Sequence, residues 1–436
     1  MSVRPGSRGQ SCPTDRTAAG VGGTSPEPLA PSPVLVLQVV PAAPVRYAET
    51  SVDRTFLPPL LAGPRRASLA LADGSVFSGY AAGPAAEATG EVVFNTSMFG
   101  YQEMLSDPSY AGQILVLTAP HVGNVGVNDD DTESARIWAQ GLIVPDLSLL
   151  PSNWRATGGL LDRLAADGIP VGWGFDTRAI VLHLRVAGAL PGLLACGGEM
   201  TPDALHERAA KAVGTDGCDW AHRVARSEPA VWSAGPWRSP GSERRDVVPG
   251  PRVTVIDCGV KSSILRHLVG AGATVSVVPP DTSAAAILAS GAGGVVFSNG
   301  PGDPAAVAGV PETIRGLLGR VPLLGICLGH QLLGLALGGR TYKLRFGHHG
   351  GNHPVRDEAT GAVWITSQNH NYAVDVASLP ERAIVTMTNL TDGSVEGIAA
   401  PDLGAEGIQF HPEAAPGPHD ALGVFARFLD RCRGGR

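Results

Sequence analysis

The chain has 436 residues, which exceeds the length of one typical domain and favours two. Its hydrophobic content of 44% is sufficient for two cores, and no apolar run approaches the ~20 residues that a membrane-spanning helix needs. A net charge of −7, without a basic stripe interleaved with aromatics, argues against a nucleic-acid partner. The six cysteines include no C-x-x-C pair, which argues against a disulfide framework and indicates a reducing, cytoplasmic location.

The N-terminal part of the chain divides into an extension and a first domain. Residues 1–62 are rich in Pro, Gly, Ser and Ala without sustained periodicity, so we expect a disordered extension. A smaller, mixed α/β domain is expected over residues 65–225. Its local patterns predict a hairpin, two further strands and one helix, at residues 67–80, 91–95, 114–118 and 160–166.

A linker and a second domain follow. Residues 226–250 are polar and Pro-rich, which predicts a linker before a domain over residues 251–436. In this second part strand and helix patterns alternate, with strands at 253–257, 274–278, 294–298 and around Leu323, and a helix at 262–270. Such alternation predicts an α/β fold with a doubly wound, mostly parallel sheet, whose active site belongs at the carboxyl ends of the strands.

One expected strand leads directly into the segment Gly325-Ile326-Cys327-Leu328-Gly329-His330-Gln331, and a helical pattern follows it. Strand, Gly-x-Cys-x-Gly, helix is the thiol version of a nucleophile elbow, in which the glycines permit a sharp turn that exposes the sulfur. The N-terminus of the following helix favours thiolate over thiol. A free cysteine at a strand end is usually a small core residue. Here the flanking glycines and a downstream base favour the interpretation of Cys327 as a nucleophile.

A candidate base lies in the segment Gln409-Phe410-His411-Pro412-Glu413. His411 can take the thiol proton, and Glu413 can orient the imidazole. Each of the two alone would be an ordinary surface or capping residue. Together with Cys327 they predict a catalytic triad.

The segment Asn299-Gly300-Pro301-Gly302-Asp303-Pro304 follows another expected strand. It is either a plain tight turn or a loop that aims a backbone N–H at an oxyanion. The residues alone do not separate these two interpretations. Both place the loop at the carboxyl edge of the sheet, where Cys327 also lies.

Three segments together resemble the class I (triad) glutamine amidotransferase domain: Ser298–Pro304, Gly325–Gln331 and His411–Glu413. Other segments resemble the small, glutamine-hydrolysing subunits of carbamoyl phosphate synthetases: Glu91–Glu103, Asp107–Tyr110, Pro120–Gly126, Gly347–Val355, Ser367–His370 and Glu413–Asp420. The resemblance covers almost everything from residue 67 onward. Its first-domain segments are specific, because other amidotransferases of the class lack that domain.

The resemblance implies that the chain hydrolyses L-glutamine to glutamate and ammonia through a thioester on Cys327. It implies a heterodimer, or a higher oligomer, with a large subunit that receives the ammonia through a tunnel. That partner makes carbamoyl phosphate from bicarbonate and two ATP for arginine and pyrimidine biosynthesis. ATP and Mg are therefore expected on the partner, and no cofactor on this chain, whose sequence has no G-x-x-x-x-G-K-[ST] loop.

The resemblance also implies a set of site residues. The catalytic positions of the family fall on Cys327, His411 and Glu413. Those that hold glutamine fall on Ser97, Gly300, Gly302, Leu328, Gln331, Asn369, Asn371 and Tyr372. The backbone N–H groups of Leu328 and of one glycine in the Gly300–Gly302 loop are expected to form the oxyanion hole.

The chain departs from the family in the N-terminal extension and at two single positions. Asn371 stands where the family usually has the glycine of Asn-His-Gly-Phe or Asn-His-Gly-Tyr. A glycine there suggests a left-handed backbone, which asparagine tolerates, so we expect the loop to survive with substrate binding altered. Ser263 replaces the usual asparagine in the segment Lys261–Arg266.

Two clusters could be mistaken for metal sites. His348, His349 and His353 have no acidic residue or cysteine at zinc spacing, so we expect no metal there. The run Asp129-Asp130-Asp131 is interpreted as a solvated helix start.

Three alternative functions stay open from the sequence. The first is an amidotransferase subunit of another or secondary pathway, such as GMP, CTP or anthranilate synthesis. The second is a non-catalytic regulatory paralogue, and the third is a free hydrolase of γ-glutamyl compounds. The first-domain segments oppose the first alternative, and the intact triad opposes the second. Full activity without a partner would indicate the third.

Overall fold

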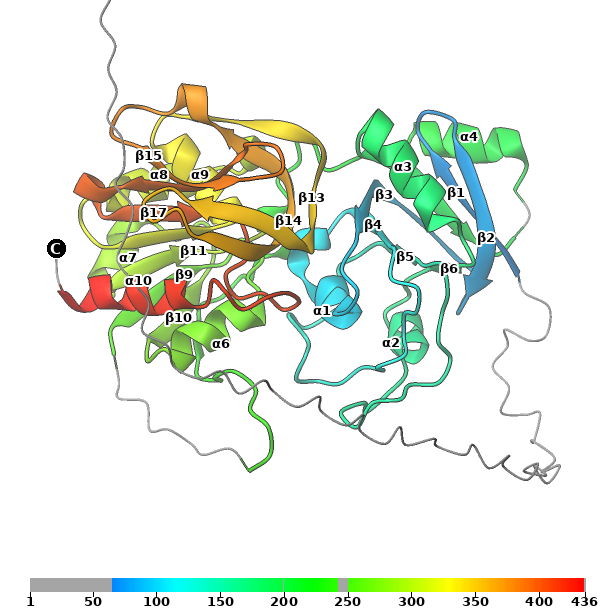
Figure 1. Cartoon of the computed structure of the whole chain (residues 1–436), viewed down its shortest axis with the longest axis horizontal. Helices are drawn as coiled ribbons and strands as arrows, with labels where there is room; N and C mark the ends of the chain where they lie inside the picture. Colours follow the sequence, from blue (N-terminus) through cyan, green and yellow to red (C-terminus); the bar gives the residue numbers. More distant parts are fainter. Residues whose placement is uncertain (1–64, 199, 242–249, 435–436) are drawn as a thin grey trace, which may run out of the picture. The chain divides into compact units, whose positions relative to one another are not determined.

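The computed structural model describes residues 65–198, 200–241 and 250–434, which form two domains (Figure 1). The extension expected at residues 1–62 lies outside the described residues, as does the part of the expected linker at 242–249. None of the described helices has the length and apolar character that crossing a bilayer requires.

The first domain contains a closed barrel with the strand order β1-β2-β6-β5-β4-β3-β7. The expected hairpin forms β1 and β2, and Gly74 makes the turn between them with a φ of 92°. The barrel closes because β7 pairs with both β1 and β3, a long-range pairing that no local pattern predicts. The strands are β1 (Arg65–Leu71), β2 (Val76–Ala82), β3 (Ala86–Asn95), β4 (Gln113–Leu117), β5 (Gly141–Ile143), β6 (Val171–Trp173) and β7 (Leu190–Cys196).

Helices α1 (Tyr101–Ser106), α2 (Leu160–Ala166) and α3 (Thr177–Ala187) lie between these strands, and α4 (Pro202–Ala210) and α5 (Ala221–Val224) follow β7. Helix α2 has the predicted bounds. Helices α3 and α4 begin at side-chain caps, since Asp176 accepts from Ala179 N and Thr201 from Ala204 N. Helix α5 packs into a core of the second domain through Ala221.

The second domain contains a 10-stranded sheet with the order β14-β13-β15-β16-β17-β12-β11-β9-β10-β8. The central strands from β17 to β10 run parallel, which confirms the predicted α/β fold with a mostly parallel central sheet. The strands are β8 (Ala230–Trp232), β9 (Arg252–Ile256), β10 (Thr274–Val278), β11 (Gly294–Phe297), β12 (Leu323–Ile326), β13 (Arg340–Asp357), β14 (Val363–Asp375), β15 (Ile384–Asn389), β16 (Val395–Ala400) and β17 (Ala405–Ile408).

Helices cover both faces of this sheet: α6 (Ser262–Gly270), α7 (Ala284–Ala289), α8 (Val310–Leu317), α9 (Leu328–Ala336) and α10 (Gly423–Gly434) (Figure 1). Helices α6 and α10 share one core, and α7, α8 and α9 share the other. Val255 of β9 lies in the first core and Ile256 in the second, because successive strand residues point to opposite faces. The sheet is therefore doubly wound, as the alternating pattern predicts.

Part of the segment expected to be a linker is a strand. Strand β8 pairs antiparallel with β10 at the edge of the second sheet. Just before it, Arg226 donates to the Asp257 carboxylate at 3.1 Å. The sequence does not predict this strand, because three residues are too few to show the alternation of polar and apolar side chains.

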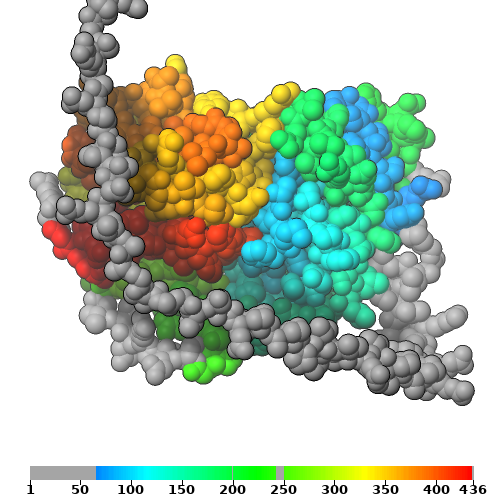
Figure 2. Space-filling model, viewed as in Figure 1, coloured from blue at the N-terminus to red at the C-terminus, as the bar shows by residue number. Residues whose placement is uncertain are grey.

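The two domains meet through buried polar contacts. Asn299 donates to Ser109 Oγ at 2.9 Å, and Ser263 donates to the Glu133 carboxylate at 2.6 Å. On the face drawn in Figure 2, first-domain residues in cyan touch the red C-terminal segment and the yellow segment of the second domain. These contacts bring first-domain side chains to the carboxyl edge of the second sheet.

Candidate active site

Cys327 occupies the sharp turn between β12 and α9. Its φ of 53° and ψ of −103° are strained for a residue with a side chain, as a nucleophile elbow requires. A Cβ on Gly325 would lie 2.4 Å from the Gly329 carbonyl oxygen, and one on Gly329 would lie 2.1 Å from that of Phe297. Only glycines therefore let the chain turn here and leave the sulfur at the N-terminus of α9.

The imidazole of His411 is oriented by Glu413. Its Nδ1 lies 2.7 Å from Glu413 Oε1, and both side chains are buried. The other ring nitrogen, Nε2, has no hydrogen-bond partner among the described residues. Burial disfavours the imidazolium, but Glu413 and Cys327 outweigh it and raise the pKa of His411 to about 10. The ring is therefore able to hold a proton taken from the thiol.

Lys261 lies behind this pair. Its Nζ lies 3.0 Å from Glu413 Oε1 and donates to the carbonyl of Ala414 at 2.6 Å. Burial disfavours the Glu413 carboxylate, but Lys261 and then His411 outweigh it and lower the pKa of Glu413 to about 2. Sequence reasoning missed this role, although Lys261 opens the segment Lys261–Arg266 that carries part of the resemblance.

A cavity opens beside Cys327, at the expected edge of the sheet. Six of the eight residues expected to hold substrate line it: Gly300, Gly302, Gln331, Asn369, Asn371 and Tyr372. Leu328 follows Cys327 as the first residue of α9, where a backbone N–H has no partner within the helix. Cys327 itself contacts the carbonyl of Asn369, 3.6 Å from Sγ.

Ser97 does not line this cavity. It lines a neighbouring cavity with Lys261 and His411 instead, while Ser109 is the first-domain serine beside Cys327. Both serines lie in segments that carry the resemblance, and sequence spacing does not say which one lines the cavity beside Cys327. The hydrogen bond from Asn299 holds Ser109 at the start of the Gly300–Gly302 loop, whereas Ser97 lies beside Lys261 and His411. Gln113, His349 and His370 also line the cavity and were not predicted.

The Gly300–Gly302 loop is held tightly against the strand end. A Cβ on Gly300 would lie 2.0 Å from the Cys258 carbonyl oxygen, and Gly302 has a φ of 93°. Asn299, directly before the loop, also donates to the Asp107 carboxylate of the first domain at 3.3 Å. The position of the loop therefore depends on both domains.

Asn371 does not have the left-handed backbone that its place in the family suggested. Positive φ at non-glycine residues of the described chain occurs at Cys327, Ala414 and Ala415. Asn371 lies inside β14, opposite an irregularity in the pairing of β13 with β14 between Lys343 and His348. That expectation is wrong because the strand carries residue 371 in extended form.

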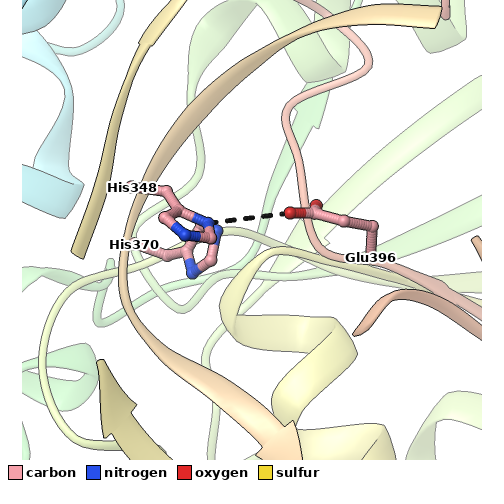
Figure 3. Close-up of side chains that lie close together, drawn as sticks. All are labelled: His348, His370 and Glu396. Atoms are coloured by element: carbon pink, nitrogen blue, oxygen red, sulfur yellow. Dashed lines mark ion pairs between the residues drawn. The ribbon is translucent and has the colours of Figure 1, made fainter. Parts of the chain in front are cut away.

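Next to the cavity, His348 and His370 lie close to Glu396, with potential ligand atoms within 4.8 Å of one another. Figure 3 shows His348 and the Glu396 carboxylate facing one another, with 3.7 Å between Nδ1 and Oε1. The ring nitrogens of His370 lie 2.7 Å from the Tyr372 carbonyl and 2.8 Å from Gln368 Oε1, and both of these atoms are acceptors. Burial lowers the pKa of His370 well below 6.5, so the neutral ring has one N–H and donates to only one of these two oxygens. His348 also lies 2.9 Å from the Asp392 carboxylate, so the group belongs to a wider hydrogen-bonded network.

The acidic run at Asp129–Asp131 does not begin a helix. It lies in a turn, where Arg155 bonds both carboxylate oxygens of Asp131 at 2.8 and 2.9 Å. The expectation of a solvated helix start is wrong, because this long-range arginine supplies the partner that a helix N-terminus would have supplied.

Two protein families match the chain. The family described as glutamine amidotransferase class-I matches residues 254–431. The family described as carbamoyl-phosphate synthase small chain, CPSase domain, matches residues 69–194. The two matches fall on the two domains of the structure.

Curated relatives match across both domains. The chain is 50% identical to the carbamoyl phosphate synthase small chain of Syntrophotalea carbinolica, over 84% of this chain and 97% of that protein. It is 46% identical to the small chain of Pseudomonas aeruginosa, over 83% and 97% of the two chains. It is 45% identical to the chloroplastic small chain of Arabidopsis thaliana, over 84% and 85%.

Proposed function

Because the chain belongs to the family of carbamoyl phosphate synthase small chains, we propose that Cys327, His411 and Glu413 hydrolyse L-glutamine through a thioester. The chain is a glutamine amidotransferase that supplies ammonia for carbamoyl phosphate synthesis. The observation that carries the proposed mechanism is the strained Cys327 turn, since few other uses require a thiol in that conformation.

The first half of the reaction forms the thioester. Cys327 gives its proton to His411 Nε2, and its sulfur attacks the side-chain amide carbon of glutamine. The N–H groups of Leu328 and of the Gly300–Gly302 loop stabilise the oxyanion. When the C–N bond breaks, His411 returns the proton to the leaving nitrogen, and ammonia departs.

The second half of the reaction restores the enzyme. A water molecule gives a proton to His411 and attacks the thioester carbon, and the C–S bond breaks. Glutamate leaves after its new carboxyl group loses a proton to solvent, and the imidazole keeps its proton beside the Cys327 thiolate, because the pKa of His411 is raised to about 10. Glu413 stays ionised throughout, which the neighbouring Lys261 supports by lowering the pKa of that carboxyl to about 2.

Glutamine binding is proposed for the cavity beside Cys327. The supporting observation is its polar lining, in which side chains from both domains converge: Ser109, Gln331, Asn369, Asn371 and Tyr372. We retain Gly300, Gly302 and Leu328 as backbone donors, and replace Ser97 by Ser109 as the contribution of the first domain.

The ammonia is proposed to leave through the neighbouring cavity. This cavity shares Asn369 with the substrate cavity and is lined by Ser97, Asp107, Lys261 and His411. Its place between the triad and the first domain supports a path toward a large-chain partner, in a heterodimer or a higher oligomer. ATP, Mg and bicarbonate would be used on that partner, in the cytoplasm, for arginine and pyrimidine biosynthesis.

The test is the substitution Cys327→Ser in the complex with the large chain. We expect loss of glutamine-dependent synthesis, whereas synthesis from added ammonia stays within about twofold, because the ammonia-using chemistry is elsewhere. Cys432→Ser, at a half-buried cysteine of α10, is the matched control and should keep both activities. Loss of the ammonia-dependent rate in an assembled Cys327→Ser complex would contradict the proposal.

The alternatives are separated by simple observations. A subunit of GMP, CTP or anthranilate synthesis is opposed by the match at residues 69–194. A regulatory paralogue would show no thioester on Cys327 when glutamine is added. A free hydrolase would run at its full rate without a partner, so the glutaminase rate of the chain alone, compared with that of the complex, decides this case.

A further inference from the structure

Asn371 connects the wall of the substrate cavity to the first domain. Its Nδ2 donates to Glu91 Oε1 in β3 at 3.0 Å, and its Oδ1 lies 2.9 Å from His349 Nε2. All three side chains are buried. A glycine at this position would make neither contact, so the link depends on the Asn371 side chain.

A second amide two residues earlier makes the mirror-image contacts. Asn369 Nδ2 donates to Asp107 Oδ2 at 3.1 Å, and its Oδ1 lies 3.0 Å from His349 Nδ1. Two carboxylates of the first domain thus hold β14 through two asparagines, with the His349 ring between them. The geometry of the cavity wall therefore depends on both carboxylates, Glu91 and Asp107.

The orientation of both amides is determined by the carboxylates. An ionised carboxylate only accepts, so each NH₂ group faces its carboxylate and each amide oxygen faces His349. A neutral imidazole has one N–H and satisfies one of the two oxygens. Burial outweighs the two asparagines and lowers the pKa of His349 to about 4, so the ring is neutral at neutral pH. Asn369 and Asn371 therefore compete for one proton.

The far end of the link is anchored independently of the ring. Glu91 Oε2 accepts from Lys343 Nζ at 3.0 Å, and from the backbone N and Oγ1 of Thr215 at 3.1 and 3.0 Å. Because these partners hold Oε2, Oε1 stays directed at Asn371. Asn371 is therefore held mainly by its hydrogen bond to Glu91, because the single N–H of His349 is shared between Asn369 and Asn371.

The backbone that this link holds lies against the catalytic residues. The carbonyl of Asn369 contacts Cys327 Sγ, and the carbonyl of Tyr372 accepts from Gln331 Nε2 at 2.7 Å. We propose that Asn371 is a positioning residue through which Glu91 of the first domain sets the affinity of the cavity for glutamine. The inference rests on the proposed glutamine site and adds a determinant of its affinity.

The test exchanges donor and acceptor across the Glu91–Asn371 contact. Asn371→Asp places two carboxylates 3.0 Å apart, and Glu91→Gln turns one acceptor into a donor. Each single change should raise KM for glutamine about tenfold or more, with kcat within about threefold, because a charge-assisted hydrogen bond is lost. The double variant E91Q/N371D restores the contact with its direction reversed, and should bring KM back to within about threefold of the parent.

Asn128→Asp is the matched control. It makes the same chemical change beside the Asp131 carboxylate, 2.8 Å away, in a turn that does not line the cavity. It should leave KM for glutamine within about twofold, even if it lowers stability. All variants are measured in the complex with the large chain, and ammonia-dependent synthesis reports assembly.

The outcomes separate this inference from the proposed function. A parent complex without glutaminase activity would overturn both. If the parent is active, two results would each overturn the positioning role alone. One is a KM of N371D within twofold of the parent KM, and the other is a KM of E91Q/N371D no lower than that of the worse single variant. If N371D fails to assemble, recovery of assembly by the double variant replaces KM as the readout, and a failure to recover overturns the role.

Discussion

Lys261 Nζ lies 3.0 Å from Glu413 Oε1, the same oxygen that lies 2.7 Å from His411 Nδ1. Lys261 and Glu413 are both almost fully buried, so their pairing occurs away from water. One carboxylate oxygen thus serves two cations when the imidazole is protonated. The lysine extends the proposed triad by one residue, and the first prediction follows from this contact.

Lys261→Met should lower the glutamine-dependent kcat by about tenfold or more, because Glu413 then lacks the cation that keeps it ionised. It should also reduce the free energy of unfolding by about 3–5 kcal/mol, the usual cost of removing one partner of a buried pair. Lys211→Met removes an exposed pair with Glu207 and should leave the free energy of unfolding almost unchanged, because water screens that pair. Steady-state kinetics and urea unfolding check both, and an unchanged kcat in Lys261→Met would contradict the role.

The pKa shifts of the triad predict how stability depends on pH. Despite burial, the pKa of His411 is raised from 6.5 to about 10, so its contribution is complete below about pH 6.5 and is lost as pH rises toward 10. The pKa of Glu413 is lowered from 4.5 to about 2, so its contribution is present above about pH 4.5 and is lost as pH falls toward 2.

His411→Asn should remove the alkaline part of this dependence. Between about pH 6.5 and pH 10, the free energy of unfolding of the parent should fall more steeply than that of the variant. Urea unfolding at several pH values in this window measures the two slopes. Equal slopes would show that the imidazole is not held as a cation in the folded chain.

The two first-domain serines should differ in their effect on glutamine binding. Ser109→Ala should raise KM for glutamine about three- to tenfold, the equivalent of one hydrogen bond, because Ser109 lines the cavity beside Cys327. Ser97→Ala should leave KM within about twofold, because Ser97 lines the neighbouring cavity. The reverse order of effects would restore Ser97 as the serine that contacts substrate.

Gly300→Ala should damage catalysis more than its small size suggests. The added Cβ would lie 2.0 Å from the Cys258 carbonyl oxygen, so the loop must move away from the proposed oxyanion. Loss of one such donor lowers kcat by about 10²–10³. Gly434→Ala, with nothing near the added Cβ, is the control and should keep the parent kcat. A Gly300→Ala variant with unchanged kcat would remove this loop from the oxyanion hole.

Local patterns predicted much of the fold for a physical reason. The bounds of α2 and α6 agree with the periodicity of their own residues, since one buried face marks a helix of that length. The Cys327 turn is local as well, because the contacts that demand glycine at 325 come from the first turn of the following helix. The parallel sheet follows from the alternation of such elements.

Other features depend on partners far along the chain. Strand β8 exists because β10 offers an edge, and the left-handed backbone expected at Asn371 is absent because β14 runs through this position as a strand, held by its pairing with β13 on either side. Neither outcome is encoded in the neighbouring residues. Each needs a hydrogen-bonding partner that only the folded sheet supplies.

By itself, the sequence predicted the alternating strands and helices of the second domain up to Leu323, the glycine turn at the proposed nucleophile, and the His-Pro-Glu segment proposed to supply the base. The tertiary structure alone decided that Ser109 lines the cavity beside Cys327 while Ser97 lines its neighbour, that Lys261 holds Glu413, and that Glu91 holds Asn371. The first group depends on steric and periodic rules within a few residues. The second depends on buried polar groups, each of which must find a partner once water is removed, wherever in the chain that partner lies.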